Sequence, residues 1–598
     1  MKSPVMFDTK SGALATRYRF FRRIIRLAGP YWTTEERWKA LGLTVALVLL
    51  TVAQVVLAIW TNYWNGALFD ALGDRSLERF LAQIGIFAII FILTIAVTGA
   101  HLQVKRQLQI GWRAWLTKRV IDRWMTEKRH YQLIFTPGEH DNPDGRISED
   151  IHNVTELAVS LTHTLVYSLL ILGSFIDILL SVAGGTDLRF DGSSIHVPGY
   201  MVVLAFGYAG VGTLLGLALG RSLVRSTNEL QTMEANFRFG LARAREEAEA
   251  IALVGGEPME RRRSFALFAD IREWWNRQSL AFTWIIFFTS GYGALLPVFP
   301  ILVCAPQYIA GTMSLGILMQ TAQAFQKLTS ALSWPIDNVT DMAKWKASAD
   351  RVLSLHEDLE KLDTPSELSA GRRIEVGTAP SSMLAVVDLH IAQPDGLLVL
   401  DGFNLEVREG EHVLIDGDAR AAVDLFKVTA GLWPWGSGRV LLPKDRAIFF
   451  MPQSPFIFPG PLRAVLSYPE DPSLFDDNAM REALDHAGLG YLAARLSDTD
   501  AWDQVLTMRG RQRLGFARLF LHRPSWIFMQ EATDAFDPLG EEKMLETMKR
   551  EFPHATILAI GFHSVLERFH ERKICLDRPA SGRYLFGGPA TDETRDDS

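Results

Sequence analysis

The chain has 598 residues, of which 48% are hydrophobic and 22% charged, and its formal net charge is -7. This length exceeds one ordinary domain and the apolar content exceeds that of an ordinary soluble enzyme, so we expect a membrane half and a soluble half. The slightly acidic balance gives no reason to expect nucleic acid as a partner. The two cysteines, Cys304 and Cys575, lie far apart in the sequence and indicate neither a disulfide framework nor a metal cluster.

The first half of the chain predicts membrane-spanning helices. About 20 apolar residues at ~1.5 Å per residue match the ~30 Å hydrocarbon core of a bilayer. Residues 41–60 form the first such stretch and contain no charged side chain. Five more follow, and the last of them is interrupted by Gln320, Gln323, Gln326 and Lys327. The six predicted spans are residues 41–60, 80–100, 158–184, 198–220, 282–309 and 313–334.

Lys and Arg collect on one side of these predicted spans. They crowd the N-terminal tail and the connections around residues 105–129 and 221–263, whereas the other connections hold few cations. Because cytoplasmic loops carry an excess of Lys and Arg, we expect these stretches and both chain ends in the cytoplasm. The cations of the tail are Lys10, Arg17, Arg19, Arg22, Arg23 and Arg26.

Both basic connections are long and helix-forming. Residues 101–135 and 201–256 contain no proline, and turn-forming residues follow each of them, at 137–145 and at 255–258. The pattern predicts spanning helices that continue into the cytoplasm and turn back there.

Four carboxylates of the membrane half are candidates for carrying protons. Asp177, with His163 nearby, lies in the third predicted span, where an ionisable group is rare unless it is paired or lines a pathway. Glu234 follows the fourth span, near the inner mouth of any cavity, and Glu246 and Glu247 come later in the same connection. A carboxyl group partly withdrawn from water has a raised pKa and can exchange protons near neutral pH. The structural alternatives are a solvated helix face for the glutamates and a helix–helix hydrogen bond for Asp177.

The second half of the chain predicts an α/β domain. We expect a membrane domain over residues 1–362, a linker over 363–382, the α/β domain over 383–590 and a tail over 591–598. Strand-like runs alternate with helical stretches, which predicts a mostly parallel sheet flanked by helices. The strand-like runs are residues 383–387, 397–399, 412–415, 447–451, 526–529, 556–560 and 573–576.

Residues 411–433 have the pattern of a strand, a phosphate-binding loop and a helix. A working loop of this kind reads GxxxxGK[ST], in which backbone N–H groups and the lysine hold phosphate and the hydroxyl holds magnesium. After Gly417 this chain places no lysine at the helix start, and Lys427 lies at least one turn further on. We interpret this as the frame of a nucleotide site without its chemistry. The residues in the loop positions are Asp418, Ala419, Arg420, Ala421, Ala422, Val423 and Asp424.

Several stretches resemble one known family. Residues 142–150, NPDGRISED, are similar to the NPDxRIxxD segment of the peroxisomal fatty-acyl transporters and the SbmA/BacA-type bacterial transporters. Residues 234–257 resemble the EAA-type segment of the same group. The second half resembles an ABC nucleotide-binding domain along its whole length. That resemblance is carried by GLWPWGSGR at 431–439, MPQ at 451–453, LGFARL at 514–519 and EATDAFD at 531–537.

The chain therefore resembles a half-size ABC transporter of the peroxisomal fatty-acyl and SbmA/BacA-like (YddA-like) group. The resemblance implies a membrane α-helical fold of the ABC-exporter and SbmA type, with six transmembrane helices and a cytoplasmic α/β domain of the ABC nucleotide-binding type.

Several positions depart from the pattern of this family. Gln530 stands where the strand normally ends in the magnesium-binding aspartate, although Glu531 and Gln453 are kept. Arg509 lies in the signature segment, where glycine permits close backbone approach. In this family a histidine, called the switch histidine, follows the next strand. Phe562 occupies that position here, and His563 lies one residue after it. Because each such contact is worth on the order of a hundredfold in rate, we interpret the domain as catalytically inactive, with ATP and magnesium binding not expected.

The resemblance then implies a function. SbmA/BacA-type members lack nucleotide domains and move peptides and other hydrophilic solutes inward with protons. We therefore expect a homodimeric, multi-pass protein of the bacterial inner membrane that takes up peptides or bulky hydrophilic solutes with protons, using Glu234, Glu246, Glu247 or Asp177. Two alternatives stay open: an ATP-driven ABC transporter of peptides, cobalamin-like or acyl solutes, and a sensor or scaffold that transports nothing.

Overall fold

The computed structural model describes residues 20, 22–135, 142–182, 185–190, 193–363, 373–394, 396–444 and 447–576. The chain divides into two compact units, each described here by itself. The first unit contains Met1–Asp122 and Asp141–His356, and the second contains Arg123–His140 and Glu357–Ser598. The tail cations Lys10, Arg17 and Arg19, residues 364–372 of the predicted linker, and the predicted tail at 591–598 lie outside the described residues.

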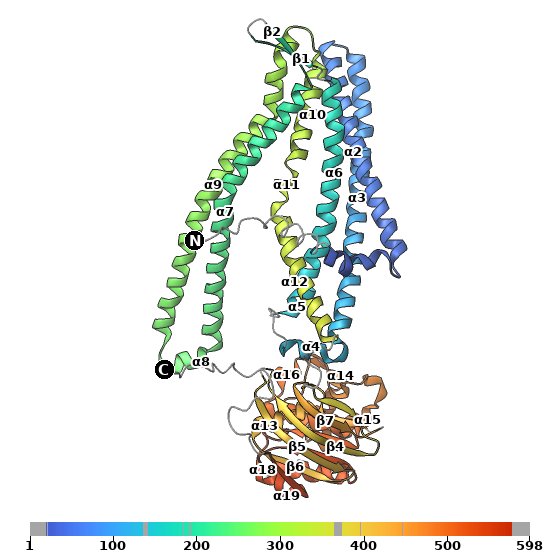
Figure 1. The fold of residues 1–598 in the computed structure, drawn as a ribbon, viewed down its shortest axis with the longest axis vertical. Coiled ribbons are helices and arrows are strands. Elements are labelled where there is room, and N and C mark those ends of the chain that lie inside the picture. Colours follow the sequence, from blue (N-terminus) through green and yellow to red (C-terminus); the bar gives the residue numbers. More distant parts are fainter. Residues whose placement is uncertain are drawn as a thin grey trace, which may run out of the picture. The chain divides into compact units, whose positions relative to one another are not determined.

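The first unit is built from long helices (Figure 1). Short elements join them, and two strands form a small antiparallel hairpin between α6 and α7. The long helices are α2 (Arg37–Gly73), α3 (Leu77–Met125), α6 (Ile151–Val182), α7 (Tyr200–Glu246), α9 (Glu257–Ile309), α10 (Leu315–Leu332) and α12 (Val339–Asp363). The short elements are η1 (Gly29–Trp32), α5 (Pro143–Gly145), β1 (Gly185–Phe190), β2 (Ser193–Pro198), α8 (Ala248–Val254) and α11 (Trp334–Asp337).

Five helical segments are long and apolar enough to cross a membrane, so the prediction of six spans is not confirmed. They are Arg37–Gly73, Leu77–Phe135, Pro143–Val182, Tyr200–Glu246 and Glu257–Ile309. The sixth predicted span, 313–334, does form helix α10. Its polar residues, Gln320, Gln323, Gln326 and Lys327, give this short helix a lower hydropathy than the other five.

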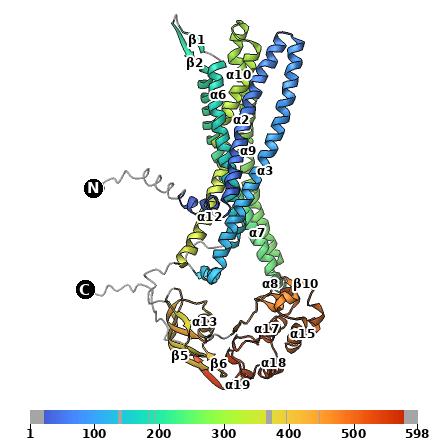
Figure 2. The same cartoon turned by 90° about the vertical axis from the view of Figure 1, so that its right-hand side faces the viewer.

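Helices α7 and α9 form a long hairpin that turns at α8, as the pattern of residues 201–258 predicts. The two helices lie side by side along most of their length (Figures 1 and 2). The ring of Tyr208 in α7 packs against that of Tyr292 in α9 with centroids 4.5 Å apart, and the Tyr208 hydroxyl donates to the Tyr292 carbonyl oxygen at 2.6 Å. The other predicted turn begins at Asn142, which has a left-handed backbone conformation just before α5.

Helix α10 packs tightly against α2 and α6. The backbone N–H of Gly316 donates to Asp70 Oδ1 at 2.7 Å, and a Cβ at this glycine would lie 2.2 Å from the carbonyl oxygen of Gly66. Further along, Asn62 Nδ2 of α2 donates to the backbone oxygen of Gln320 and to Gln323 Oε1, both at 3.1 Å. These contacts fix the register of α10 on α2.

The second unit is an α/β domain with two sheets. The first is entirely parallel in the order β13-β6-β12-β11-β8, as predicted. The second has the order β3-β7-β4-β5, and its β4–β5 and β4–β7 pairs are antiparallel, which differs from the prediction. Strand β5 explains the difference, because its buried Leu405 and Val407 alternate with exposed Glu406 and Arg408. Such alternation is typical of antiparallel sheets with one solvated face.

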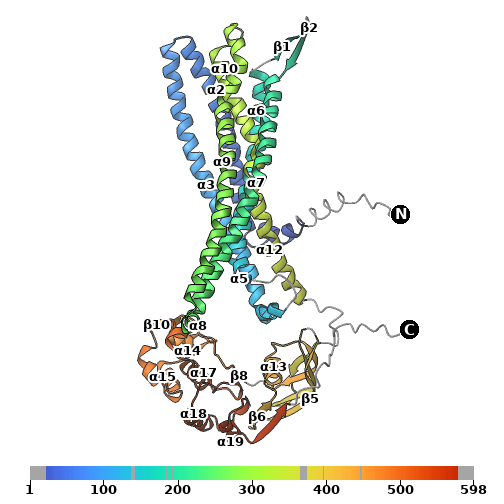
Figure 3. The ribbon, with the colours of Figure 1, turned by 90° about the vertical axis from the view of Figure 1, so that its left-hand side faces the viewer.

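The elements of this domain gather into a part with the antiparallel sheet and a more helical part (Figure 3). The strands are β3 (Glu375–Thr378), β4 (Met383–Ala392), β5 (Leu398–Arg408), β6 (His412–Gly417), β7 (Gly436–Leu442), β8 (Ile448–Met451), β9 (Gly460–Pro461), β10 (Thr499–Asp500), β11 (Trp526–Gln530), β12 (Thr556–Ile560) and β13 (Arg572–Leu576). The helices are α13 (Ala419–Thr429), α14 (Leu462–Ser467), α15 (Asp477–His486), α16 (Trp502–Val505), α17 (Met508–His522), α18 (Pro538–Glu551) and α19 (Ser564–Phe569).

The end of the first long basic connection belongs to this second unit. Residues 123–135 include α4 (Arg129–Gln132) and dock where α13 ends. The ring of Phe135 meets those of Trp433 and Trp435 edge-on, with centroids 5.1 and 5.0 Å apart. Lys128 Nζ donates to the backbone oxygen of Ala430. The segment that leaves the membrane half is thus anchored next to the helix that follows the phosphate-type loop.

Candidate functional site

The phosphate-type loop begins at Gly417, where strand β6 ends. This glycine has a φ of 105°, and a Cβ there would lie 2.4 Å from the carbonyl oxygen of Leu576. Because only glycine tolerates both conditions, it permits the sharp turn from β6 into α13. The sequence therefore predicts this strand, turn and helix correctly.

Two aspartates accept the backbone N–H groups of this turn. Asp416 Oδ1 accepts from the N–H of Gly417 at 2.7 Å, and Asp418 Oδ1 caps α13 by accepting from the N–H of Ala421 at 2.9 Å. Lys573 Nζ lies 2.6 Å from Asp416 Oδ2 and holds the pKa of that carboxyl below its usual range. Within the same loop Arg420 is exposed and Ala422 is buried.

The other predicted nucleotide-site residues gather at the same edge of the sheet. The parallel register places Ile415 of β6 beside Ile560 of β12, and Ile560 beside Gln530 of β11. The segments that follow these strands therefore emerge together. They carry Asp418, Arg420 and Ala422 after β6, Gln453 after β8, Glu531 after β11, and Phe562 and His563 after β12.

Polar contacts connect the residues of this edge. Gln453 Nε2 donates to Asp534 Oδ2 at 2.9 Å. Gln512, which the sequence did not single out, donates to the backbone oxygens of Gln453 and Glu531 at 3.1 and 3.3 Å. Arg509 lies further along, with Nη1 3.2 Å from Asp537 Oδ1. The contacts hold the segments after β8 and β11 in one arrangement.

Glu531 is a carboxylate of this edge whose pKa is raised. Burial raises the pKa of Glu531, the nearby Asp534 raises it further, and His563 partly offsets both. Its backbone is left-handed, with a φ of 45°, and its N–H donates to the carbonyl oxygen of Ile560 at 2.8 Å. A half-buried carboxylate with a raised pKa is suited to accept a proton.

His563 is paired with a buried carboxylate that the sequence did not reveal. Glu541 of α18 is 2% exposed, and its Oε2 lies 3.2 Å from His563 Nδ1. Thr533 donates its hydroxyl to Glu541 Oε1 at 2.6 Å. Phe562 points outward and is 45% exposed. Nothing in the local sequence marks Glu541, since its partners come from two other segments.

The four carboxylates predicted to carry protons do not form a common site in the part of the first unit that the structure describes. Asp177 on α6, Glu234 and Glu246 on α7, and Glu247 between α7 and α8 are all exposed. Asp177 and Glu234 lie on different helices, and Glu246 and Glu247 lie at the hairpin turn. The structure does not bring these carboxylates together.

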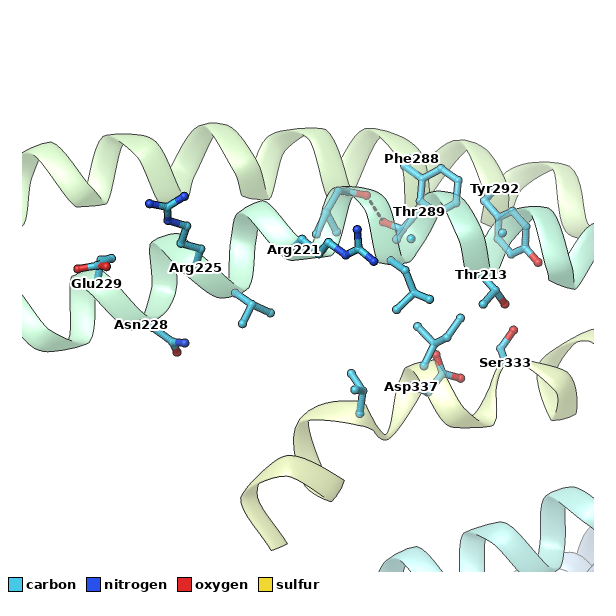
Figure 4. Close-up of a pocket in the computed structure, with 18 residues that line it drawn as sticks. Thr213, Arg221, Arg225, Asn228, Glu229, Phe288, Thr289, Tyr292, Ser333 and Asp337 are labelled. Carbon is cyan, nitrogen blue, oxygen red and sulfur yellow. Dashed lines mark hydrogen bonds between the residues drawn. The ribbon is translucent and has the colours of Figure 1, made fainter. Parts of the chain in front are cut away.

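A cavity of ≈ 730 Å³ opens in the membrane unit among α7, α9, α11 and α12 (Figure 4). Its wall includes Leu217, Ile285 and Phe288. Arg221 comes from α7, whereas Asp337 comes from the facing α11 (Figure 4). The remaining polar side chains are Thr213, Arg225, Asn228, Glu229, Thr289, Tyr292 and Ser333. The sequence did not reveal this cavity, because residues far apart in the chain make its walls.

Comparisons with known proteins describe both halves of the chain. Residues 30–309 match the family described as ABC transporter transmembrane region 2. The chain is 29% identical to the inner membrane ABC transporter ATP-binding protein YddA of Escherichia coli, over 89% of this chain and 93% of that protein. It is 25% identical to the chloroplastic ABC transporter D family member 2 of Arabidopsis thaliana, over 96% of this chain and 88% of that protein. It is 24% identical to the human lysosomal cobalamin transporter ABCD4, over 93% of this chain and 94% of that protein.

A solved structure shares the fold. A bacterial Atm1-family ABC exporter with ATP bound superimposes with a TM-score of 0.64 and 15% sequence identity. The match covers 91% of this chain and 94% of the exporter. The expected exporter-like membrane region with a C-terminal α/β domain is therefore confirmed.

These findings contradict three of the sequence-based predictions. Proton-coupled uptake is wrong, because the relatives over nearly the whole chain are ABC transporters and favour the ATP-driven alternative. The prediction of an inactive domain, neither an ATPase nor a binder of ATP and magnesium, is contradicted by relatives named for ATP binding. The prediction was wrong because substitutions at a few positions of the α/β domain do not outweigh a similarity that extends over 89% of the chain.

Proposed function

Because residues 30–309 carry an ABC transporter transmembrane region and the chain has the layout of a half-size ABC transporter, we propose that this protein is an ATP-driven membrane transporter. The observation that carries the proposal is the similarity to YddA over 89% of the chain, which includes both units. The sensor alternative has no such support. The proton-carrying role of Glu234, Glu246, Glu247 and Asp177 is given up with the uptake function.

The edge of the parallel sheet fits a nucleotide with magnesium. The backbone N–H groups at the start of α13 are the kind of donors that hold phosphate at helix N-termini. Gln453, Glu531 and Asp534 offer the carbonyl and carboxylate oxygens that magnesium prefers. ATP hydrolysis supplies the free energy that such a transporter uses.

Glu531 and Asp418 have specific proposed roles at this edge of the sheet. Glu531 accepts the proton of the attacking water, because its raised pKa makes it a better base than an ordinary glutamate. The Asp418 carboxylate gives up its hydrogen bond from the N–H of Ala421 when phosphate binds the N–H groups at the start of α13. The two negatively charged groups repel each other and cannot share these donors. Nucleotide binding therefore competes with the Asp418 cap.

The cavity of ≈ 730 Å³ is the proposed place for the solute. Its apolar wall suits a hydrophobic body, and its charged side chains are two cations, Arg221 and Arg225, and two carboxylates, Glu229 and Asp337. An amphipathic solute that carries both a positive and a negative group fits this lining better than one with a single sign of charge. We assign the cavity, and not the exposed carboxylates, to solute recognition.

Two copies of the chain complete the proposed transporter. Half-size members of this architecture work in pairs, and each copy has only one α/β domain. We propose that the termini and the α/β domain lie in the cytoplasm, because the excess of Lys and Arg in the basic connections favours that side. Phe135, packed against Trp433 and Trp435, then links events at the end of α13 to the membrane helices.

Nucleotide binding and phosphate release test this function. The full chain in lipid nanodiscs is expected to bind a fluorescent ATP analogue with magnesium and to release inorganic phosphate. The Glu531→Gln variant should keep binding and lose release. If ATP at millimolar-range excess over the protein neither binds nor is cleaved, the proposal of ATP-driven transport is wrong.

A further inference from the structure

A second cavity, of ≈ 390 Å³, lies inside the membrane unit, and we call it the Lys327 cavity. Its walls come from α2, α3, α6 and α10, whereas the larger cavity is bounded by α7, α9, α11 and α12. Its polar side chains include Gln54, Thr61, Thr94, His163, Gln323 and Lys327.

This cavity lies deep along the helices. Helix α2 ends at Gly73, α3 begins at Leu77 and α10 begins at Leu315. The bond between Asp70 and Gly316 holds two of these ends side by side. Counted from there at ~1.5 Å per residue, Thr61 and Lys327 lie roughly 18 Å into the bundle, and Thr94 roughly 26 Å. The cavity therefore sits within the ~30 Å hydrocarbon core.

Lys327 places an ammonium group on this wall. Among the residues that the structure describes, no carboxylate lies within ion-pair distance of Lys327. A lysine at membrane depth usually pairs with an opposite charge or lines a pathway. We therefore expect a negatively charged group in the cavity that neutralises the ammonium of Lys327.

The neighbours of Lys327 add hydrogen-bond donors. Gln323 Oε1 accepts from Asn62, so the Gln323 side chain has its –NH₂ group left for the cavity. Thr61 and Thr94 donate their hydroxyl hydrogens back to Leu57 and Ile90 of their own helices. These two threonines can therefore only accept, whereas Lys327 and the Gln323 amide can donate, as can Gln54 and Tyr167 on the same wall.

His163 completes the polar wall. Both of its ring nitrogens are shielded from solvent and have no hydrogen-bond partner within the described part of the chain. Its ring lies against that of His101 at a tilt of 45°, with centroids 4.2 Å apart. Buried polar atoms nearly always have a partner in proteins, in the chain, in water or in a ligand. A ligand oxygen in the cavity would satisfy one of these nitrogens.

We propose that the Lys327 cavity binds an anionic group, a carboxylate or a phosphate, through Lys327, Gln323 and His163. The cavity has room for a small anion or for one lipid head group, but not for a folded polypeptide. This binding needs no nucleotide hydrolysis, so its test is independent of the proposed transport cycle. The same chemistry has two sources, a water-soluble anion and the head group of an anionic lipid.

The experiment compares the full chain with Lys327→Gln, Lys327→Arg and the control Lys39→Gln, which neutralises an exposed lysine of α2 outside the cavity. In one arm, octanoate and inorganic phosphate are titrated calorimetrically into protein in neutral phosphatidylcholine nanodiscs. In the other arm, native mass spectrometry counts the phosphatidylglycerol molecules retained by protein from mixed nanodiscs. Size-exclusion profiles and circular dichroism establish that each variant is folded.

The expected result is a loss of at least tenfold in affinity, or of retained lipid, for Lys327→Gln alone, with binding kept in Lys327→Arg and Lys39→Gln. Loss in the first arm identifies a soluble anion, and loss in the second identifies a lipid head group. Equal binding by the full chain and folded Lys327→Gln in both arms would overturn the proposal. So would an absence of binding by the unmodified chain in both arms.

Discussion

The carboxylate of Asp418 accepts a hydrogen bond of 2.9 Å from the backbone N–H of Ala421, at the start of the helix that follows the phosphate-type loop. The N–H groups at such a helix start are also natural ligands for phosphate. One side chain of the protein thus holds a position that a nucleotide must use. The strength of nucleotide binding is therefore linked to a cap that can be changed by mutation.

Asp418→Asn is expected to tighten ATP binding. The amide keeps an oxygen for the cap but removes a negative charge from the phosphate position, so we expect about a tenfold lower Kd, which is ~1.4 kcal/mol. Titration of a fluorescent ATP analogue measures the change. Asp418→Ala separates the two effects, since loss of the cap should lower stability by ~1 kcal/mol. Unchanged affinity in both variants would show that the cap and nucleotide do not compete.

Asp416 should contribute stability that depends on pH. Lys573 lowers the pKa of Asp416 in the folded state, so the contribution is present above the unfolded pKa, near 3.9, and is lost as pH falls through the lower folded value. Because the pair is partly exposed, we expect at most about 1 kcal/mol. Urea unfolding of Asp416→Asn should show this deficit at pH 7 and a progressively smaller one as pH falls below the unfolded pKa. A deficit independent of pH would rule out the ion pair as its cause.

Phe135→Ala should weaken the attachment of residues 123–135 to the α/β domain. The variant loses two edge-on aromatic contacts, each worth roughly 0.5–1.5 kcal/mol. Proteolysis within residues 123–135 should become faster, and nucleotide-stimulated transport should fall more than nucleotide binding. The neighbouring Ile134 is 70% exposed, so Ile134→Ala is the matched control. Equal behaviour of the two variants would contradict the docking role.

Gly316→Ala should separate α10 from α2. The new methyl group would lie 2.2 Å from the Gly66 oxygen, a backbone atom that cannot move aside cheaply. Overpacking of this kind costs about 1–3 kcal/mol, and we expect a lower Tm in detergent. Gly42→Ala on α2 meets no atom within 4 Å and should leave the Tm unchanged or raise it. Equal melting of the two variants would argue against the observed helix register.

Local patterns predicted much of the fold. The turn at Gly255–Pro258 and the strand before Gly417 were foreseen, because glycine, proline and runs of apolar residues act over a few neighbours. The convergence of Gln453, Glu531 and His563 was also foreseeable, since parallel strands end at one edge of a sheet. The resemblance to half-size ABC transporters agrees with the similarity to YddA over 89% of the chain.

Features that depend on tertiary packing were not predicted. Glu541 is buried against Thr533 and His563, and no local pattern reports such a contact. Arg221 and Asp337 line one cavity, and the helices that form its walls lie far apart in the sequence. The functional prediction failed for another reason: it inferred lost activity from side chains without considering that the whole chain matches ATP-binding relatives.

Phosphate release by the purified full chain in nanodiscs, measured with ATP and magnesium beside Glu531→Gln, tests the central claim most directly. The account predicts release that saturates with ATP, falls on the order of a hundredfold or more in Glu531→Gln, and declines as pH falls through the raised pKa of Glu531. Release that is absent at saturating ATP, or equal in the two proteins, would contradict it.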